Sequence, residues 1–377
     1  MLDHLDAGRY CSYCTLLCER HPVLQPGIPC VYRHCTDGLF TLDKRVPVLH
    51  SKTIMIRGLV IGKFMPLHKG HIALIKFAAR HCDELIVSMS YTDNDPIDGT
   101  LRFSWILEQF CADPKIKPHL IKDDFDDETL PLEERTQIWA KKMKAVYPPI
   151  QVLISSEAYG PPFGRHMNAR HIFFDPGRSQ VPVSATAIRN RPLTNWNFIP
   201  AHIQPHFLKK ICFYGPESTG KTTLTAKMAR HYHTTYVPEA ARYLLTSNEF
   251  SAADIVAIGR LQHQYIQERS KTANRLLFCD TDAITTRIYS HLYLNHVPPE
   301  IFELEKCTRY DLYLLLDIDT PWIADPLRDQ GHRRKEMMQL FEQELQQRQL
   351  PYQKISGSYP KREMLIISIL DRLLRSW

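Results

Sequence analysis

The sequence predicts an α/β protein with two successive parallel sheets, and three observations support this fold class. Short apolar segments alternate with segments of helical length from about residue 55 to residue 191. The alternation stops over residues 192–209, where three prolines fall, and resumes at residue 210. A turn that contains glycine follows the first apolar segment of each half. Short apolar strands that alternate with helices are typical of a parallel sheet covered on both faces.

The elements of each half follow from this alternation. In the first half, the expected strands are Gly58–Ile61, Glu84–Ser90, Gln151–Ile154 and His171–Phe174, and the expected helices are His71–Arg80, Leu101–Phe110 and Leu132–Val146. In the second half, the expected strands are Ile211–Tyr214, Leu276–Cys279 and Leu312–Leu316, and the expected helices are Lys221–Tyr232, Ser251–Lys271, Ala283–Leu294 and Arg362–Arg375. Residues 236–237 are expected to form one further strand of the second half.

The chain of 377 residues is long enough for two or three domains that each bury a core. We expect a cysteine-rich, poorly ordered extension over residues 1–54, a first domain over residues 55–191 and a second domain over residues 210–377. Residues 192–209 are expected to be a linker. Its aromatic side chains indicate that it packs against its surroundings.

Composition narrows the classes of function. The chain is 44% hydrophobic and 23% charged, with a net charge of +6. This mild charge suits small anionic molecules and does not indicate nucleic-acid binding. No apolar run is long enough to span a bilayer, and the first 20 residues lack the pattern of a signal peptide. We therefore expect a cytoplasmic protein that has no membrane partner and is unlikely to bind DNA.

The first candidate site is the segment GKFMPLHKGH at residues 62–71, which directly follows an expected strand. His68 and His71 lie one helical turn apart, so both can face the same ligand. The helix N-terminus adds unpaired N–H groups, and Gly70 lets a phosphate approach the backbone closely. The alternative is that one histidine caps the helix or packs in the core. The whole pattern favours phosphate binding.

The second candidate site is the segment GPESTGKT at residues 215–222, which lies between an expected strand and an expected helix. This spacing is that of a P-loop, in which backbone N–H groups surround the phosphates of ATP. Lys221 would reach the β- and γ-phosphates, and the Thr222 hydroxyl would bind Mg²⁺. The residues expected to bind this ATP are Gly215, Glu217, Ser218, Thr219, Gly220, Lys221, Thr222 and Thr223.

Charged residues beyond the P-loop complete the kinase prediction. Asp280 ends an apolar strand, where it can bind Mg²⁺ with Thr222 or accept a proton from the substrate hydroxyl. Asp282 could share this task or cap the next helix. Arg328 lies in a basic segment of the kind that forms the lid of small-molecule kinases, and the alternative is a solvated helix start. The predicted catalytic residues of this half are Lys221, Asp280 and Arg328.

The first segment resembles the signature of the nucleotidyltransferase superfamily, and VSATAIR at residues 183–189 resembles its second element. The resemblance implies a Rossmann-like domain that transfers the AMP group of ATP to a substrate phosphate. It implies that His68 and His71 are catalytic and contact the α-phosphate, whereas Lys63 and Arg189 hold the other phosphates. The residues implied to bind this ATP are Gly62, Lys63, Phe64, Gly70, Ser184, Thr186 and Arg189.

The two motif sets in this order resemble the bifunctional NAD-salvage enzymes of the NadR type. The resemblance runs from about residue 55 to the C-terminus and includes residues 238–242, 280–282 and 320–322. It implies an adenylyltransferase followed by a ribosylnicotinamide kinase. The implied ligands are nicotinamide riboside, nicotinamide mononucleotide, ATP, NAD and Mg²⁺. The lid departs from the family, because residues 325–328 read DPLR where members tend to read DGLR, which predicts a stiffer lid.

Six residues are candidates for substrate binding, and all except Arg102 have a structural alternative. Glu239 and Arg242 could hold the ribose hydroxyls or lie at the surface. Trp139 and Tyr265 could each stack on the nicotinamide ring or pack in the core. Arg102 lies at a helix start where ligands bind in open α/β sheets. Asp282 is the sixth, with the helix cap as its alternative.

The first 54 residues contain five cysteines and do not resemble the helix-turn-helix that some family members carry. Their cysteine spacing fits no metal motif closely, so a zinc site remains a weaker alternative to an unstructured extension. Two other functions stay open: an enzyme pair acting on another phosphorylated metabolite, and an NAD-responsive regulator. The sequence leaves the oligomeric state open, with a homo-oligomer as one option.

Overall fold

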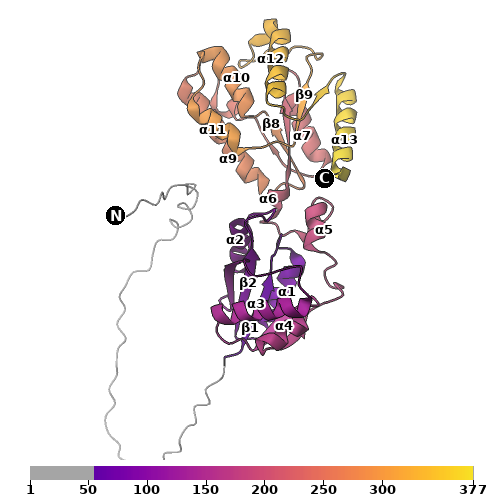
Figure 1. Cartoon of the computed structure of the whole chain (residues 1–377). Coiled ribbons are helices and arrows are strands. Elements are labelled where there is room, and N and C mark those ends of the chain that lie inside the picture. The colour runs from indigo at the N-terminus through magenta and orange to yellow at the C-terminus, as the bar shows by residue number, and fades with distance from the viewer. Residues whose placement is uncertain (1–54, 377) are drawn as a thin grey trace, which may run out of the picture. The chain divides into compact units, whose positions relative to one another are not determined.

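The computed structural model describes residues 55–376, and these form two five-stranded sheets in which all neighbouring strands run parallel (Figure 1). The predicted α/β class is therefore confirmed. The predictions for residues 1–54, including the zinc alternative and the missing helix-turn-helix, lie outside the described residues. Across residues 55–376, no helix combines the length and apolar character that a membrane span requires.

The first sheet has the strand order β3-β2-β1-β4-β5. Its strands are β1 (Arg57–Gly62), β2 (Glu84–Tyr91), β3 (Ile116–Lys122), β4 (Val152–Ser155) and β5 (Arg170–Phe173). Its helices are α1 (Lys69–Ala79), α2 (Gly99–Phe110), α3 (Leu132–Val146), α4 (Gly160–Met167) and α5 (Ala185–Asn190). The chain runs outward from β1 to β3 and then returns to the other side of β1, so the strand order reverses between β1 and β4.

Side chains of the central strands alternate between two apolar cores. Leu59 and Leu153 pack with α3 and α4 on one face of the sheet. Val60 and Ile154 pack with α1 and α2 on the other face. All four side chains are fully buried. This burial on both faces explains why residues 58–61 of β1 and residues 152–154 of β4 are apolar in sequence.

The second sheet has the strand order β10-β9-β6-β8-β7. Its strands are β6 (Lys209–Tyr214), β7 (Tyr236–Val237), β8 (Leu276–Asp280), β9 (Leu312–Leu316) and β10 (Tyr352–Ile355). Its helices are α7 (Lys221–His231), α8 (Ala241–Leu244), α9 (Ala252–Ser270), α10 (Ala283–Leu294), α11 (Pro299–Cys307), the short 3₁₀ helix η2 (Gln330–Arg333), α12 (Arg334–Gln347) and α13 (Tyr359–Ser376). Here the order reverses between β6 and β9.

The second sheet is also covered on both faces. Ile211 and Phe213 of β6 pack with α7 and α13, whereas Cys212 and Tyr214 face the core that includes α10 and α12. Figure 1 shows α7 and α13 on one side of the sheet and α9, α10 and α11 on the other. Buried Cys212 and Cys279 lie in β6 and β8 without a disulfide, and they fill space as small apolar side chains.

The predictions differ from the structure at helices α4 and α11, which were not expected, and at two sheet edges. Strands β3 and β10 were not expected, and both are edge strands. Strand β3 contains Pro118, which a sheet tolerates at an edge because one side of an edge strand needs no hydrogen-bond donor. Strand β10 is short and carries the exposed residues Gln353 and Lys354. Neither edge strand is apolar throughout, so neither is recognisable as a buried strand.

The segment between the two sheets contains a 3₁₀ helix, η1 (Trp196–Phe198), and a short helix, α6 (Gln204–Phe207). Trp196, Ile199 and Ile203 are buried, so this segment packs, as its aromatic side chains indicated. The boundaries at residues 191 and 210 stay predictions.

Candidate nucleotide-binding sites

Each predicted phosphate-binding loop follows the central strand of its sheet. Residues 63–68 connect β1 to α1, and residues 215–220 connect β6 to α7. Strands β1 and β6 both border the point where the strand order reverses. In open parallel sheets, ligands bind beyond the carboxyl ends of the strands at such a point. Both predicted sites therefore occupy the position where this fold binds ligands.

In the first site, His68 is the N-cap residue of α1 and is almost completely buried. The N–H groups of Gly70 and His71 donate to His68 Nδ1 at 3.1 and 3.4 Å. Burial, assisted by the charge of Arg178, lowers the pKa of His68 to about 4. Because Nδ1 accepts these bonds, the neutral ring carries its proton on Nε2. His68 thus both caps the helix and offers an uncharged N–H donor.

His71 stacks on His68, with their ring centroids 3.7 Å apart. Its Nδ1 atom is buried and has no hydrogen-bond partner within residues 55–376. Burial, followed by the nearby His68 and Arg178, lowers the pKa of His71 well below its ordinary value. A Cβ atom at Gly70 would lie 2.9 Å from the His68 ring, so glycine is required beside the pair. The loop therefore presents two neutral imidazoles together.

The second motif of this domain lies next to the first. Arg189 Nη1 donates to the carbonyl of Met65 at 2.5 Å, and Arg189 Nη2 donates to Thr186 Oγ1 at 3.1 Å. Ser184 caps α5 by accepting a bond from the Ala187 N–H at 3.1 Å. The structure thus brings residues 184–189 to residues 63–71, called the histidine loop below. In the sequence, 124 positions separate Arg189 from Met65. The role of residues 184–189 in ATP binding remains a prediction.

The other predicted residues of the first domain occupy different settings. Lys63 lies at the surface, with its ammonium group 3.5 Å from Glu128 Oε1. Phe64 is buried, and its ring meets His71 edge-on at 5.0 Å. Trp139 Nε1 donates to Asp126 Oδ1 at 2.9 Å, and its ring packs edge-on against Tyr159, which caps α4, and Phe163 within α4. The structural alternative describes what Trp139 does here, and substrate contact remains untested.

Arg102 is fully buried and bonded on all sides. Its Nε atom donates to the carbonyl of Ile97 at 2.9 Å, and its terminal nitrogens donate to the carbonyls of Ser90 and Lys63 and to the carboxylate of Asp95. The structure therefore gives its guanidinium group partners within the protein, and its predicted contact with substrate stays a prediction. Arg178, by contrast, acts electrostatically on both histidines. Its position shortly before residues 184–189 was the only signal in the sequence.

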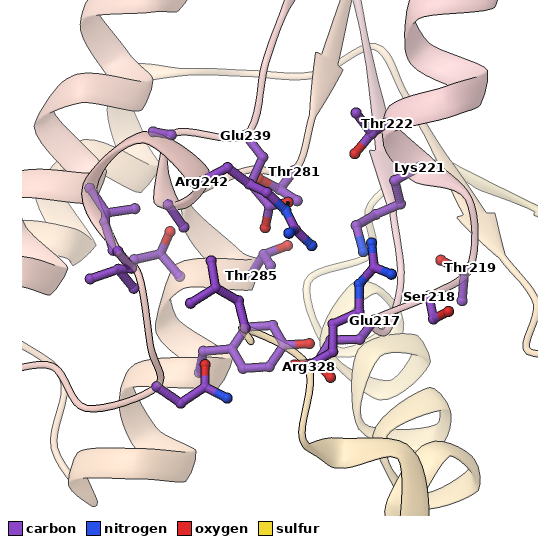
Figure 2. Close-up of a pocket in the computed structure, with 18 of the residues that line it drawn as sticks. Glu217, Ser218, Thr219, Lys221, Thr222, Glu239, Arg242, Thr281, Thr285 and Arg328 are labelled. Carbon is purple, nitrogen blue, oxygen red and sulfur yellow. Dashed lines mark ion pairs between the residues drawn. The ribbon is translucent and has the colours of Figure 1, made fainter. Parts of the chain in front are cut away.

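In the second site, the P-loop lines a pocket with a volume of about 270 Å³. Lys221 Nζ donates to the carbonyls of Gly215 and Pro216, each at 2.9 Å, which holds the ammonium group over the loop. Gly220 has φ of 90°, and a Cβ atom there would lie 2.3 Å from the hydroxyl of Tyr359. Figure 2 shows Lys221, Arg242 and Arg328 converging on the same space. The pocket therefore gathers positive charge around one point, as binding of a polyphosphate requires.

Asp280 and Thr222 provide the oxygen atoms that Mg²⁺ prefers. The Thr222 hydroxyl donates to Asp280 Oδ2 at 2.6 Å. Asp280 Oδ1 is buried and has no partner within residues 55–376. Burial, reinforced by the charge of Glu239, raises the pKa of Asp280 to about 7. A carboxylate oxygen left without a partner beside a hydroxyl fits a hard divalent cation.

A chain of ion pairs connects the pocket wall to residues 325–334, the segment predicted to form a lid and called the lid segment below. Asp325 accepts bonds from Arg242 at 2.7 Å and lies 3.3 Å from Arg328 Nε. Arg242 also lies 3.5 Å from Glu239. Glu239, Arg242 and Arg328 all line the pocket. The structure thus brings these three predicted residues together. Arg333, which follows Arg328 in the same basic segment, pairs with Glu336 at the surface.

Glu217 of the P-loop lies beneath the same lid segment. Its Oε2 accepts a bond from the Gln330 N–H at 3.3 Å. Burial raises the pKa of Glu217 to about 7, and the nearby Asp329 contributes in the same direction. The second site therefore contains two carboxyl groups, the half-buried Glu217 and the fully buried Asp280, whose pKa values are both raised to about 7.

Two predicted residues of the second domain lie away from the pocket lining. Asp282 is buried as the N-cap of α10, where it accepts bonds from the N–H and hydroxyl of Thr285 and from the hydroxyl of Tyr313. Tyr265 packs against the apolar core and meets Tyr243 edge-on. For both residues, the structural alternative describes what is observed.

Aromatic residues that the sequence did not single out line the pocket instead. Tyr289 and Tyr293 of α10 both face it, and the Tyr289 hydroxyl is buried without a hydrogen-bond partner in the described part of the chain. Gln262 of α9 also lines the pocket, and its amide donates to the carbonyl of Asp280 at 3.3 Å. The signal in the sequence was the spacing of four between the two tyrosines, which places them on one face of a helix.

Comparison with known proteins identifies relatives for both halves. A cytidylyltransferase-like family model matches residues 59–97, and an AAA domain model matches residues 210–362. The trifunctional NAD biosynthesis/regulator protein NadR of Salmonella typhimurium is 32% identical over 299 residues, which cover 73% of this chain and 72% of the relative. The Escherichia coli protein of the same name is 30% identical over 352 residues, or 86% and 84% of the two chains.

Solved structures agree with this assignment at the level of the fold. The crystal structure of a NadR protein in complex with NAD and AMP-PNP has a TM-score of 0.70 at 23% identity and covers 84% of this chain and 96% of that one. Because the two curated relatives are at least 30% identical and are covered over more than two thirds of their length, this chain belongs to the NadR family of NAD biosynthesis proteins.

Proposed function

We propose that this chain makes NAD from nicotinamide riboside in two ATP-dependent steps. The pocket of the second domain phosphorylates the 5′-hydroxyl of the riboside, which yields nicotinamide mononucleotide and ADP. The site around His68 and His71 then joins the mononucleotide to the AMP group of a second ATP and releases pyrophosphate. The observation that carries the proposal is the presence of two phosphate-binding loops, each beyond the central strand of its own sheet, in one chain of the NadR family.

In the kinase step, the protein must place the hydroxyl in line with the transferring group and stabilise negative charge. Lys221 supplies positive charge from the P-loop and Arg328 from the lid segment. Glu239 and Arg242 line the same pocket and can hold the ribose hydroxyls. The pyridinium ring of the riboside is cationic, so an aromatic wall such as Tyr289 would attract it through a cation–π interaction.

Magnesium belongs to the kinase step in this proposal. Thr222 and Asp280 would hold the ion, since one offers a hydroxyl and the other a buried carboxylate oxygen without a partner. When bound there, Mg²⁺ would neutralise charge on the β- and γ-phosphates. The Asp280 carboxyl must lose its proton before it can bind the ion, which connects the kinase step to pH.

In the adenylyl transfer step, the attacking group is a phosphate that already carries negative charge, so no general base is required. His68 and His71 can donate hydrogen bonds to the phosphates as neutral imidazoles. Burial keeps both rings uncharged at neutral pH, so their N–H groups remain available without protonation. Arg189, bonded to the histidine loop through the Met65 carbonyl, can hold the leaving pyrophosphate.

Product analysis with ATP and Mg²⁺ tests the proposal directly. The wild-type protein should form NAD from nicotinamide riboside and from nicotinamide mononucleotide, with the mononucleotide as an intermediate from the riboside. Lys221→Ala should slow phosphorylation of the riboside by about 1,000-fold and leave adenylylation of the mononucleotide unchanged. His71→Ala should do the reverse and make the mononucleotide accumulate.

Lys227→Ala is a matched control, since Lys227 lies on the same helix as Lys221 but pairs with Glu363 at the surface. It should leave both reactions unchanged. Nicotinate riboside and nicotinate mononucleotide, supplied in parallel, reveal which form of the ring is preferred. Formation of no dinucleotide from any of the four substrates would refute the proposal and favour another phosphorylated metabolite.

A further inference from the structure

The two largest side chains that are fully buried within residues 55–376 are both arginines, Arg102 and Arg362. Burial of a guanidinium group is costly unless its donors are paired. Each of these arginines belongs to a different domain, and each is bonded to three backbone carbonyls and one carboxylate. A fully buried guanidinium group with four bonded partners in each domain indicates a role beyond packing.

Arg362 lies in the first turn of α13. Its nitrogens donate to the carbonyls of Thr219 at 2.8 Å, Asp317 at 2.8 Å and Gly357 at 2.9 Å, and to the carboxylate of Asp319. Thr219 belongs to the P-loop, Asp317 follows β9, and Gly357 follows β10. One side chain therefore joins three loops at the carboxyl end of the second sheet.

The bond to Thr219 sets the direction of a neighbouring N–H group. The carbonyl of Thr219 and the N–H of Gly220 belong to the same planar peptide and point in opposite directions. When Arg362 holds the carbonyl in the interior, the Gly220 N–H is aimed away from it. Gly220 lines the pocket, so this N–H is one of those that can surround a phosphate.

Arg102 likewise joins several loops of the first domain through one buried guanidinium group. It holds the carbonyls of Lys63, Ser90 and Ile97 and pairs with Asp95. Lys63 belongs to the histidine loop, whereas Ser90 lies at the end of β2. The residue after Lys63, Phe64, has φ of 44°, a strained conformation that the loop must be held to keep. Arg102 thus holds the carbonyl of the peptide that joins Lys63 to Phe64.

We propose that Arg362 and Arg102 are positioning residues, each of which holds the phosphate-binding loop of its own domain in the conformation that binds ATP. The planar guanidinium group can satisfy three carbonyls and a carboxylate at fixed angles, which a lysine ammonium group cannot do. The assays that test the proposal through activity rest on the proposed function, and a second measurement below does not.

The first experiment uses each domain as the control for the other. Arg362→Lys should lower kcat for riboside phosphorylation by about 100-fold and raise KM for ATP, since misplaced loop atoms bind the transition state poorly. Its KM for the riboside and its rate of adenylylation should stay within about twofold of wild type. Arg102→Lys should show the opposite pattern.

Matched controls separate position from charge. The controls are Arg372→Lys and Arg165→Lys. Arg372 is an exposed residue of α13, and Arg165 lies on α4, where it pairs with Glu133 at the surface. Both should leave the two reactions unchanged. If Arg362→Lys fails to fold, Asp319→Asn decides the question. It keeps the arginine but removes the charge of its partner and one of the two oxygens that accept bonds from Arg362 and from the Gly357 N–H. It should lower the kinase rate by about tenfold and spare adenylylation.

Amide hydrogen exchange tests the proposal without any substrate. Arg362→Lys should speed exchange in the peptide that contains residues 215–222 by about tenfold and leave residues 62–70 as in wild type, and Arg102→Lys should do the reverse. Equal activity in the lysine variants and wild type, or an equal loss of both activities with unchanged loop exchange, would overturn the proposal. If the wild-type protein were inactive on all substrates, that result would refute only the proposed function. Amide exchange in the two loops would still test the role of the two arginines.

Discussion

The two phosphate-binding loops begin alike, after the central strand of a parallel sheet, but they gather opposite kinds of ionisable group. The first loop presents His68 and His71, whose pKa values burial lowers. The second loop lies beside Glu217 and Asp280, whose pKa values burial raises to about 7. Burial disfavours charge of either sign. The imidazoles are therefore neutral near pH 7, whereas the carboxyl groups change their charge there.

The difference matches the chemistry proposed for each site. Adenylyl transfer starts from an ionised phosphate, so the first site needs hydrogen-bond donors and no base. Phosphorylation of the riboside starts from a neutral hydroxyl that must lose its proton, and it uses a metal ion that needs an ionised ligand. A carboxyl group is useful only in the second case. The same loop position thus serves two reactions because different side chains surround it.

The largest expected effect comes from Asp280, the last residue of β8, with Asp282 two positions later as the comparison. Asp280→Asn should lower the kinase rate by about 1,000-fold, because it removes the charge of the proposed Mg²⁺ ligand. Asp282→Asn should change the kinase rate by less than about threefold and cost about 1 kcal/mol of stability, because asparagine can cap α10 but loses one hydrogen-bond acceptor. Kinase assays and thermal unfolding of both variants provide the measurement.

Adenylylation is the internal control for this pair and should stay at the wild-type rate in both variants. If Asp282→Asn lost as much kinase activity as Asp280→Asn, Asp282 would act in the reaction and the interpretation as a helix cap would be incomplete. Asp282 would then be a third functional carboxyl group of the kinase site, beside Glu217 and Asp280.

The next effect concerns pH. The raised pKa of Asp280 means that the carboxylate is present above about pH 7 and is lost as the pH falls through that value. At subsaturating Mg²⁺, the kinase rate should therefore fall by about tenfold for each pH unit below 7, and saturating Mg²⁺ should restore it, because protons and the metal compete. His68 stays neutral down to about pH 4, so adenylylation should lose no activity through its protonation above pH 5.

The ratio of the two rates in one preparation is the quantity to measure. Protonation of ATP and loss of its magnesium complex affect both reactions, so they largely cancel in the ratio. A ratio that stays constant between pH 8 and pH 5.5 would contradict the assignment of Asp280 as the group that limits metal binding.

Much of this arrangement could be predicted from the sequence, because loops that bind phosphate have demanding local requirements. The P-loop and the histidine loop need glycines and charged residues at fixed spacing, and both were located. The uniformly apolar central strands were located as well, since burial on both faces leaves no polar positions. The edge strands β3 and β10 were missed because they are partly exposed and therefore lack that pattern.

Residues that act through tertiary contacts could not be predicted. Arg362 and the Thr219 carbonyl are 143 positions apart, and nothing near Arg362 in the sequence marks it as a partner of the P-loop. Tyr289 reaches the pocket only because α10 packs beside α9. Tyr265 was a comparable aromatic residue on a neighbouring helix, and only the packing of α9 turns it towards the core. Local pattern thus locates the loops, and packing selects their supporting residues.

The smallest expected effect concerns residues 325–328 of the proposed lid segment beside the kinase site. Pro326 occupies the second position of a turn that the Arg328 N–H closes on the Asp325 carbonyl at 2.9 Å. Proline is favoured at this position, and the turn uses the N–H groups of Leu327 and Arg328, so no donor is missing. Pro326→Gly should change the kinase kcat by less than about threefold and lower stability by about 1 kcal/mol or less.

Steady-state kinetics and thermal unfolding check this prediction, with adenylylation as the unaffected reference. A rise in kcat of about tenfold or more would mean that lid opening limits turnover and that the proline slows it. That result would add a difference in dynamics to the difference in charge between the two sites. A small change would instead mean that the turn, held by Asp325 to Arg242 and Arg328, is already set by its ion pairs and not by the proline.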